Sequence, residues 1–173
     1  MILSKWIIRN KIKGLVLQSK KRNHRFISLK DVQSLFLLVD LETYRALAED
    51  IEALKKENKQ VSVCLIVQGN EDYRDVNADL VLNIKHDLNW LGLPASDFLD
   101  SMKKFPANLF ISLTEKESYL TSYLTLSHPA PMKIGINRQG DNIYDFSITP
   151  TEKKDIRFLF GQILFYLRTI DAK

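Results

Sequence analysis

The sequence predicts an α/β fold: a three-layer α/β/α sandwich built on a mostly parallel sheet of five or six strands. Short apolar runs, typical of strands buried on both faces, alternate along the chain with amphipathic helical patterns. The length of 173 residues and the hydrophobic content of 45% are those of one globular domain with a sizeable core. We expect a Rossmann-like domain, although the chain lacks the Gly-x-Gly-x-x-Gly fingerprint of dinucleotide binding.

Residues 1–30 differ in charge from the rest of the chain, since they carry nine Lys or Arg and no Asp or Glu. Residues 31–173 hold 16 basic and 21 acidic side chains, so the net charge of +4 comes from the opening segment. We predict a basic N-terminal helix and linker over 1–30, followed by a single α/β domain over 31–173. A basic arm on an acidic body suits an anionic partner, a class that includes nucleic acid, anionic lipid and acidic protein surfaces.

Apolar spacing predicts the first three elements. Residues 1–20 form a helix with a basic stripe, but their apolar residues are spread around the circumference more widely than in a membrane-surface helix. The run 34–39 is a buried strand, and Asp40 after it can cap a helix. That helix has the most clearly apolar face, formed by Tyr44, Leu47, Ile51 and Leu54.

The middle of the chain is predicted to contribute three strands and one short helix. Residues 61–67 have a strand-like composition and end at a Gln68-Gly69-Asn70 turn. Residues 80–85 form a weaker strand. A short helix near 95–105 then leads to a buried strand over 108–113.

Capping residues predict where the last two helices begin. Thr114 with Glu117 forms one capping box, in which each side chain satisfies a backbone amide of the first turn. Thr149 with Glu152 forms another, and Pro150 suits the first helical position. Both helices are expected to start directly after a strand.

Two strands, 132–136 and 143–148, lie between these helices and flank a turn-like segment, 137–142. We expect a hairpin or another tight connection there. The last strand is placed at an edge of the sheet, with an antiparallel direction as the open alternative.

Ligands of such sheets bind where the carboxyl ends of strands meet the starts of helices. The segments 40–43, 68–73, 86–90 and 112–117 occupy such positions in the predicted fold. These are the places where we expect a site.

Acidic, hydroxyl and basic residues follow several predicted elements in a suggestive order. In chain order they are Asp40, Glu42, Thr114 (or Ser112), Lys133 and Asp141. This order resembles the motifs of haloacid-dehalogenase-like phosphatases, in which an Asp attacks phosphorus, Mg²⁺ bridges carboxylates and phosphate, and a Lys neutralises charge. However, Glu42 is longer than that family's second Asp, Lys133 lies in a strand, and Asp40 and Thr114 are explained as caps. A phosphoryl-transfer or nucleotide-binding enzyme that requires Mg²⁺ is therefore the alternative function.

Metal and thiol chemistry find little support in the sequence. His24, His86 and His128 lack the spacing of a zinc site, so no metal or other cofactor is predicted. Cys64 lies within a predicted strand and is expected to be buried and inert. A single cysteine indicates a reducing compartment, and no apolar run reaches the length of a transmembrane segment, so we expect a cytoplasmic protein.

The loop with His86, Asp87, Asn89 and Trp90 is a candidate ligand or partner site. Its alternative, which we favour, has Trp90 and Leu91 folded back as a core plug, with Asn89 satisfying the loop backbone, because aromatic side chains are usually buried.

The basic arm is the other candidate binding region. Only Trp6 and Phe26 lie among its charges, which argues against sequence-specific nucleic-acid binding. We expect a non-enzymatic binding or interaction module that uses this arm toward an anionic or protein partner, and leave its oligomeric state open. The anion-binding residues are Lys5, Arg9, Lys13, Lys20, Lys21, Arg22 and Arg25.

Several short motifs are spread over nearly the whole chain. They are Ser4-Lys5-Trp6-Ile7, residues 29–40, Asp87-Leu88-Asn89-Trp90-Leu91-Gly92, Met132-Lys133-Ile134-Gly135 and Tyr144-Asp145-Phe146. Together they resemble an uncharacterised family of small cytoplasmic proteins of the Bacteroidetes, a domain of unknown function. The resemblance implies an α/β domain in a bacterial cytoplasm. It carries no activity, so no functional residue is transferred from it.

Overall fold

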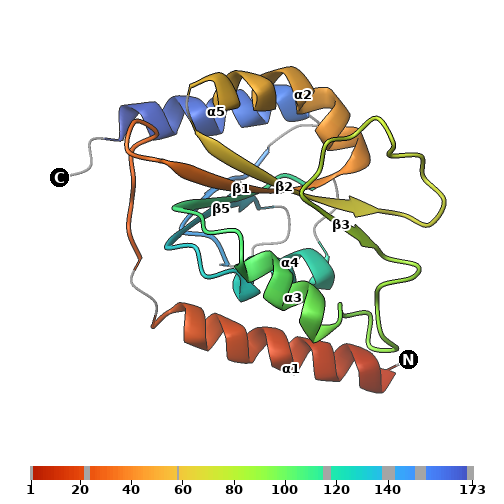
Figure 1. Ribbon diagram of the computed structural model, residues 1–173. Helices are drawn as coiled ribbons and strands as arrows, with labels where there is room; N and C mark the ends of the chain where they lie inside the picture. Colours follow the sequence, from red (N-terminus) through yellow and green to blue (C-terminus); the bar gives the residue numbers. More distant parts are fainter. Residues whose placement is uncertain are drawn as a thin grey trace.

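A six-stranded, all-parallel sheet forms the centre of the computed structural model (Figure 1). The structure describes residues 2–21, 24–57, 59–114, 118–137, 143–150 and 155–170. The order across the sheet is β3-β2-β1-β4-β5-β6, which confirms the predicted Rossmann-like α/β class. The strands are β1 (Ser34–Asp40), β2 (Gln60–Val67), β3 (Leu80–Asn83), β4 (Leu109–Ser112), β5 (Met132–Ile136) and β6 (Phe146–Ile148).

Helices cover both faces of this sheet (Figure 1). Helices α2 and α5 lie on one face, α3 and α4 lie on the other, and α1 lies outside α3 and α4. None of the helices in the described part of the chain is both long and apolar enough to cross a membrane. The helices are α1 (Ile2–Ser19), α2 (Leu41–Lys56), α3 (Ser96–Lys103), α4 (Tyr119–Ser127) and α5 (Ile156–Thr169).

The whole apolar run of β1 is buried because both faces of the sheet are covered. Successive side chains of a strand point to opposite faces of a sheet. Leu35 and Leu37 pack into the core beneath α2 and α5, whereas Phe36 and Leu38 pack into the core beneath α3 and α4. A continuous apolar sequence is what a strand needs when it is covered on both sides.

The helix α1 adds a third, smaller core outside the sandwich. Ile8 and Ile12 pack against Leu126 of α4, and against Leu93 and Tyr144. This contact explains part of the wide apolar distribution around α1, because one side of the helix is covered by the domain.

The strand β6 corrects the predicted hairpin. It pairs with β5 in parallel, with Ile134 opposite Phe146, so the chain cannot turn back directly between the two strands. Before β6 begins, Ile143 and Tyr144 are buried in the core beneath α1. Residues 138–142 lie outside the described part of the chain. Turn-forming side chains in this segment favoured a hairpin, but the parallel pairing requires the chain to cross back to the other end of β5 before β6 begins.

Both predicted helix starts are also corrected. The helix α4 begins at Tyr119, capped by Ser118, whereas Thr114 lies in the segment that follows β4. Ser118 and Thr121 form the reciprocal hydrogen bonds of a capping box, so the motif occurs four residues later than expected. Glu117 lies outside the described residues.

The helix α5 begins at Ile156, and its cap Asp155 lies six residues after the predicted cap Thr149. Thr149 and Pro150 are not helical and connect β6 to the segment before α5. Proline at this position is compatible with extended backbone as well as with a first helical turn, which is why the sequence signal was ambiguous. Glu152 lies outside the described residues.

Cys64 provides a direct probe of the core around β2. Its side chain is fully buried, and burial raises the pKa of the thiol to about 12. The thiol therefore stays protonated and inaccessible at neutral pH. We expect an aromatic disulfide reagent to label no thiol in the folded protein and one thiol in denaturant. Equal labelling rates in the two conditions would contradict this packing.

Candidate functional site

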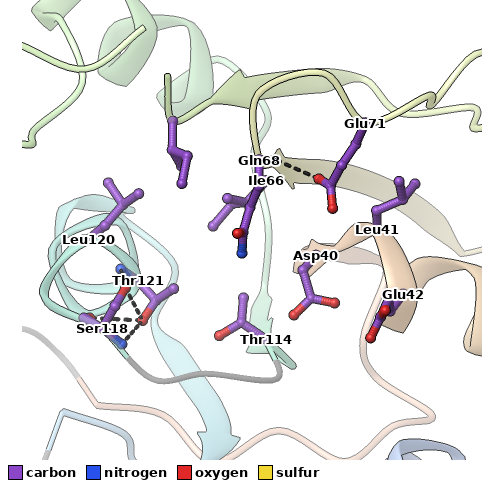
Figure 2. Close-up of a pocket in the computed structure, with 11 residues that line it drawn as sticks. Asp40, Leu41, Glu42, Ile66, Gln68, Glu71, Thr114, Ser118, Leu120 and Thr121 are labelled. Carbon is purple, nitrogen blue, oxygen red and sulfur yellow. Dashed lines mark hydrogen bonds between the residues drawn. The ribbon is translucent and has the colours of Figure 1, made fainter. Parts of the chain in front are cut away.

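The order of the strands creates a crevice at one edge of the sheet. Connections from β1 lead toward β2, while β4 lies on the other side of β1, so the segments leaving β1 and β4 diverge. A cavity of about 430 Å³ lies at these carboxyl ends (Figure 2). We call it the strand-end pocket. Its lining residues are Asp40, Leu41, Glu42, Ile66, Gln68, Glu71, Ile84, Thr114, Ser118, Leu120 and Thr121.

Asp40 and Glu42 form the wall contributed by β1 and α2. The Asp40 carboxylate accepts a hydrogen bond of 2.9 Å from the backbone amide of Thr43, and so caps α2. Glu42 lies in the first turn of that helix, where a negative charge is favourable. The local rule that places acids at a helix start therefore also places two carboxylates at the pocket.

Glu71 is brought to the pocket by the segment that follows β2. Gly69 has a φ of +68°, which allows the sharp turn, and its carbonyl accepts a 2.8 Å hydrogen bond from Asn83. The Glu71 carboxylate accepts from the backbone amide of Gln68 and points toward the space beside Asp40 (Figure 2).

Arg45 of α2 binds the later part of the segment that follows β2. Its guanidinium donates to the Asp72 carbonyl at 2.8 Å and to both carboxylate oxygens of Asp75. The hydrogen bond to Arg45 lowers the pKa of the Asp75 carboxyl. These contacts are at the surface, so their contribution is positional rather than a large gain in stability.

The facing wall is neutral. It consists of Thr114 at the end of β4 and of Ser118, Leu120 and Thr121 at the start of α4 (Figure 2). Ser118 and Thr121 are held by the capping box, so their side chains have defined positions. The pocket therefore has carboxylates on one side and hydroxyls on the other, with apolar surface between them.

The predicted phosphatase constellation is only partly assembled. Asp40, Glu42 and Thr114 line the same pocket, but Lys133 does not. Lys133 is buried beneath α4, where its ammonium donates to the Leu126 carbonyl at 3.2 Å. It lines a separate cavity of about 190 Å³ between α1 and α4. Asp141 lies outside the described residues.

Metal ligands do not gather in the part of the chain that the structure describes. No group of three His, Cys, Asp or Glu side chains there is arranged to hold a metal ion. The prediction that no metal is bound stays a prediction.

Three of the four segments predicted at the strand ends line this pocket, namely 40–43, 68–73 and 112–117. Sequence reasoning did not single out Gln68, Glu71, Ser118 or Thr121 as site residues. Gln68 and Glu71 fall within a segment that was named, so their position after β2 was the available signal. Ser118 and Thr121 were missed because α4 was expected to start at Thr114.

The fourth segment, 86–90, forms a separate loop, and here the favoured prediction was wrong for Trp90 but confirmed for Leu91 and Asn89. Trp90 is 78% exposed rather than a core plug. Its neighbours Leu91 and Leu93 pack against α1 instead. The Asn89 carboxamide accepts from the backbone amides of both leucines, at 2.9 and 3.2 Å, so the loop has its own internal structure.

Asp87 and His86 are the other two candidate binding residues of this loop. Asp87 accepts from the backbone amide of Asn83 at 2.7 Å, and His86 is exposed. Their role in binding a ligand or partner stays a prediction.

The basic arm keeps most of its predicted charges at the surface. The exposed ones are Arg9, Lys13, Lys20, Lys21 and Arg25. Arg22 and the side chain of Lys5 lie outside the described part of the structure. His24, in the same arm, pairs with the largely buried carboxylate of Asp145.

Comparison with family models matches residues 5–170 to a family described as a family of unknown function (DUF6913). No curated protein and no solved structure matches this chain. The family match covers nearly the whole sequence and confirms the resemblance to a domain of unknown function. The Bacteroidetes origin and the cytoplasmic location stay predictions.

Proposed function

We propose, from the premise that the chain belongs to DUF6913, a family of unknown function, that this protein is a non-enzymatic binding module for a small molecule. The observation that carries the proposal is the strand-end pocket, which lies where the strand order reverses. Open α/β sheets bind their ligands at this position. The volume of about 430 Å³ is within the range of roughly 300–1,000 Å³ that is typical of small-molecule sites.

The polar lining selects the class of ligand. Asp40, Glu42 and Glu71 present carboxylate oxygens, which accept hydrogen bonds. Among the described lining residues there is no Lys, Arg or His to attract a phosphate. The ligand that fits carries hydroxyl or ammonium donors on one side and an apolar face against Ile66 and Leu120.

A thermal-shift panel tests this proposal. The probes are free nucleosides, sugars and polyamines, set against phosphate esters with and without Mg²⁺. A probe at a hundred times its dissociation constant stabilises the folded state by about 2.7 kcal/mol, which raises the melting temperature by roughly 5–10 °C. A shift from a neutral or cationic probe supports the proposal. A panel without any shift would count against it.

Glu71→Gln tests the carboxylate wall, because it removes a charge and keeps the size of the side chain. The shift should be reduced in this variant. Glu52→Gln is the matched control, since Glu52 forms an exposed pair with Lys55 on α2 and does not line the pocket. An equal loss of the shift in both variants would exclude a specific contact.

Asp40→Asn separates a binding role from a structural one. Asn caps a helix almost as well as Asp, so we expect the free energy of unfolding to change by less than about 0.5 kcal/mol. The ligand-induced shift should nevertheless fall. Chemical unfolding with and without the probe measures both quantities.

A phosphoryl-transfer enzyme remains the alternative function, because Asp40, Glu42 and Thr114 do line one pocket. Mg²⁺ would have to supply the positive charge there, since Lys133 lies in another cavity. Turnover of phosphate esters that needs Mg²⁺ and is lost in Asp40→Asn would favour this alternative over simple binding.

The basic arm supports a second binding function, toward an anionic partner. The helix α1 stays attached to the domain through Ile8 and Ile12, while Arg9, Lys13 and Lys20 remain exposed. Binding to a polyanion such as heparin should weaken steeply with salt, because each contact releases counterions. The variant Arg9→Gln/Lys13→Gln should bind more weakly with a smaller salt slope. An unchanged slope would contradict a role for these two charges.

A further inference from the structure

We propose that the outward face of α1, together with the exposed Trp90 of the loop 86–94, docks this protein on the surface of an anionic lipid bilayer. This inference rests on the second binding function above and names its partner. The helix α1 and the loop 86–94 do not line the strand-end pocket, so the small-molecule function assigns no role to them.

The helix α1 has two apolar sides. Ile8 and Ile12 occupy the side covered by the domain. Trp6 and Leu17 lie on the opposite side and are 62% and 63% exposed. They are eleven residues apart, close to three full turns, so they project in nearly the same direction. We call this side the outward face.

Basic side chains share the outward face with these two residues. Arg9, Lys13 and Lys20 are exposed. Arg9 follows Trp6 by three residues, Lys13 precedes Leu17 by four and Lys20 follows Leu17 by three, which puts all three cations on the same side of the helix. Residues 1–30 contain no acid that would oppose an anionic surface. The domain covers Ile8 and Ile12, so the large apolar side chains that remain mostly exposed on the described part of α1 lie on the outward face. Lys, Arg, Trp and Leu are the residue types of helices that lie in the headgroup region of a membrane.

The loop that follows β3 lies next to α1 and adds one more exposed aromatic side chain. It reaches the N-terminal end of α1 (Figure 1), where Leu91 and Leu93 pack in the same core as Ile8. Trp90 projects from this loop with 78% of its surface exposed. Tryptophan is enriched at membrane interfaces because its ring is apolar and its indole N–H is polar. Both tryptophans of the chain are therefore exposed beside one end of α1.

The position of this surface favours a bilayer over a nucleic acid. The helix α1 is the outermost layer on its side of the sheet (Figure 1), and the described side chains of its outward face are exposed. Binding to single-stranded nucleic acid needs a basic groove with stacked aromatic rings, and Leu17 offers no stacking surface. A bilayer accepts both an aliphatic and an aromatic side chain and supplies the negative charge.

Vesicle binding tests the proposal directly. The full chain is mixed with vesicles of phosphatidylcholine and phosphatidylglycerol, or of phosphatidylcholine alone, and bound protein is measured by sedimentation. We expect binding at least about tenfold tighter to the anionic vesicles. Tryptophan emission should shift to shorter wavelength on binding, because Trp6 and Trp90 are the only two tryptophans. The variants Trp6→Phe and Trp90→Phe then show which side chain enters the interface.

Matched variants separate the outward face from other exposed side chains. Trp6→Ser/Leu17→Ser should weaken binding by about tenfold or more, and Arg9→Gln/Lys13→Gln should weaken it and flatten its salt dependence. Phe165→Ser is the apolar control, because Phe165 is 61% exposed on α5, across the molecule from α1. Lys55→Gln/Lys56→Gln on α2 is the charge control. Unchanged unfolding midpoints would show that the outward-face variants remain folded.

Three other results of these binding measurements would overturn the bilayer proposal. Salt-sensitive binding to heparin or nucleic acid without binding to anionic vesicles overturns the bilayer proposal and leaves the second binding function intact. Binding to neither overturns both. Self-association without lipid that is lost in Trp6→Ser/Leu17→Ser would show that a second copy of the chain covers the outward face, which also overturns the proposal.

Discussion

Gly135→Ala is expected to lower the free energy of unfolding by about 3 kcal/mol, because the added methyl group has no space. Gly135 lies in the buried strand β5, and the ring of Tyr144 packs directly over it. A Cβ atom at this position would fall well inside contact distance of the ring and 2.8 Å from the phenol oxygen. Tyr144 is itself enclosed in the core beneath α1, so its ring cannot simply swing away.

Urea unfolding measures this effect, and two variants control it. Gly161→Ala in α5 meets nothing within 4 Å, so we expect it to stabilise the protein by about 0.5–1 kcal/mol through helix propensity. In a Tyr144→Leu background, Gly135→Ala should cost much less than in the natural chain. Equal costs in the two backgrounds would show that the ring is not the obstacle.

Acidification is the second condition with a large expected effect, and His128 is its main source. The imidazole is buried against Phe36 and Phe110, and burial lowers its pKa from 6.5 to about 4. Its Nδ1 accepts a hydrogen bond of 3.1 Å from the backbone amide of Ala130. Nε2 lies 3.2 Å from the Phe105 carbonyl, so the neutral ring with its proton on Nε2 satisfies both contacts.

The sign of the pH effect follows from these values. Between pH 6.5 and about 4, the unfolded chain binds a proton at His128 that the folded chain does not bind. The free energy of unfolding should therefore be constant above pH 7 and fall by about 3 kcal/mol as the pH decreases to 4.

Chemical unfolding at several pH values checks this expectation. His128→Asn is the comparison variant, because the Asn side-chain oxygen can still accept from Ala130 but does not titrate. This variant should be less stable at pH 7, and its stability should depend less on pH. Parallel curves for the two proteins would assign the acid sensitivity to other groups.

The alternation of buried strands and amphipathic helices was sufficient to predict the fold class. Runs such as 34–39 and 108–113 can be buried on both faces only in a covered sheet, and the structure places them at its centre. The predictions that failed depended on local signals with two valid interpretations. Pro150 fits both a helix start and extended backbone, and the segment 137–142 resembles a turn although β6 runs parallel to β5.

The sequence was sufficient to predict which segments line the strand-end pocket. It was not sufficient to predict which residues of different segments face each other there. Asp40 and Thr114 follow strands that are far apart in the sequence and adjacent in the sheet. Strand order, which periodicity does not encode, brings them together. The predicted burial of Trp90 was wrong for a different reason. Asn89 holds the loop through hydrogen bonds to its backbone, and Leu91 and Leu93 supply its apolar contacts. The loop therefore keeps its conformation without burying the tryptophan.

The docking of α1 also has a consequence for biosynthesis. The helix is translated before residues that cover Ile8 and Ile12, because these include Leu126 and Tyr144. At translation rates of about 5–20 residues per second, the interval between Ile12 and Leu126 is roughly 6 to 23 s. Throughout that time both apolar sides of the nascent helix are open. Any surface that binds apolar side chains would therefore have access to Ile8 and Ile12 during synthesis, although the folded protein buries them.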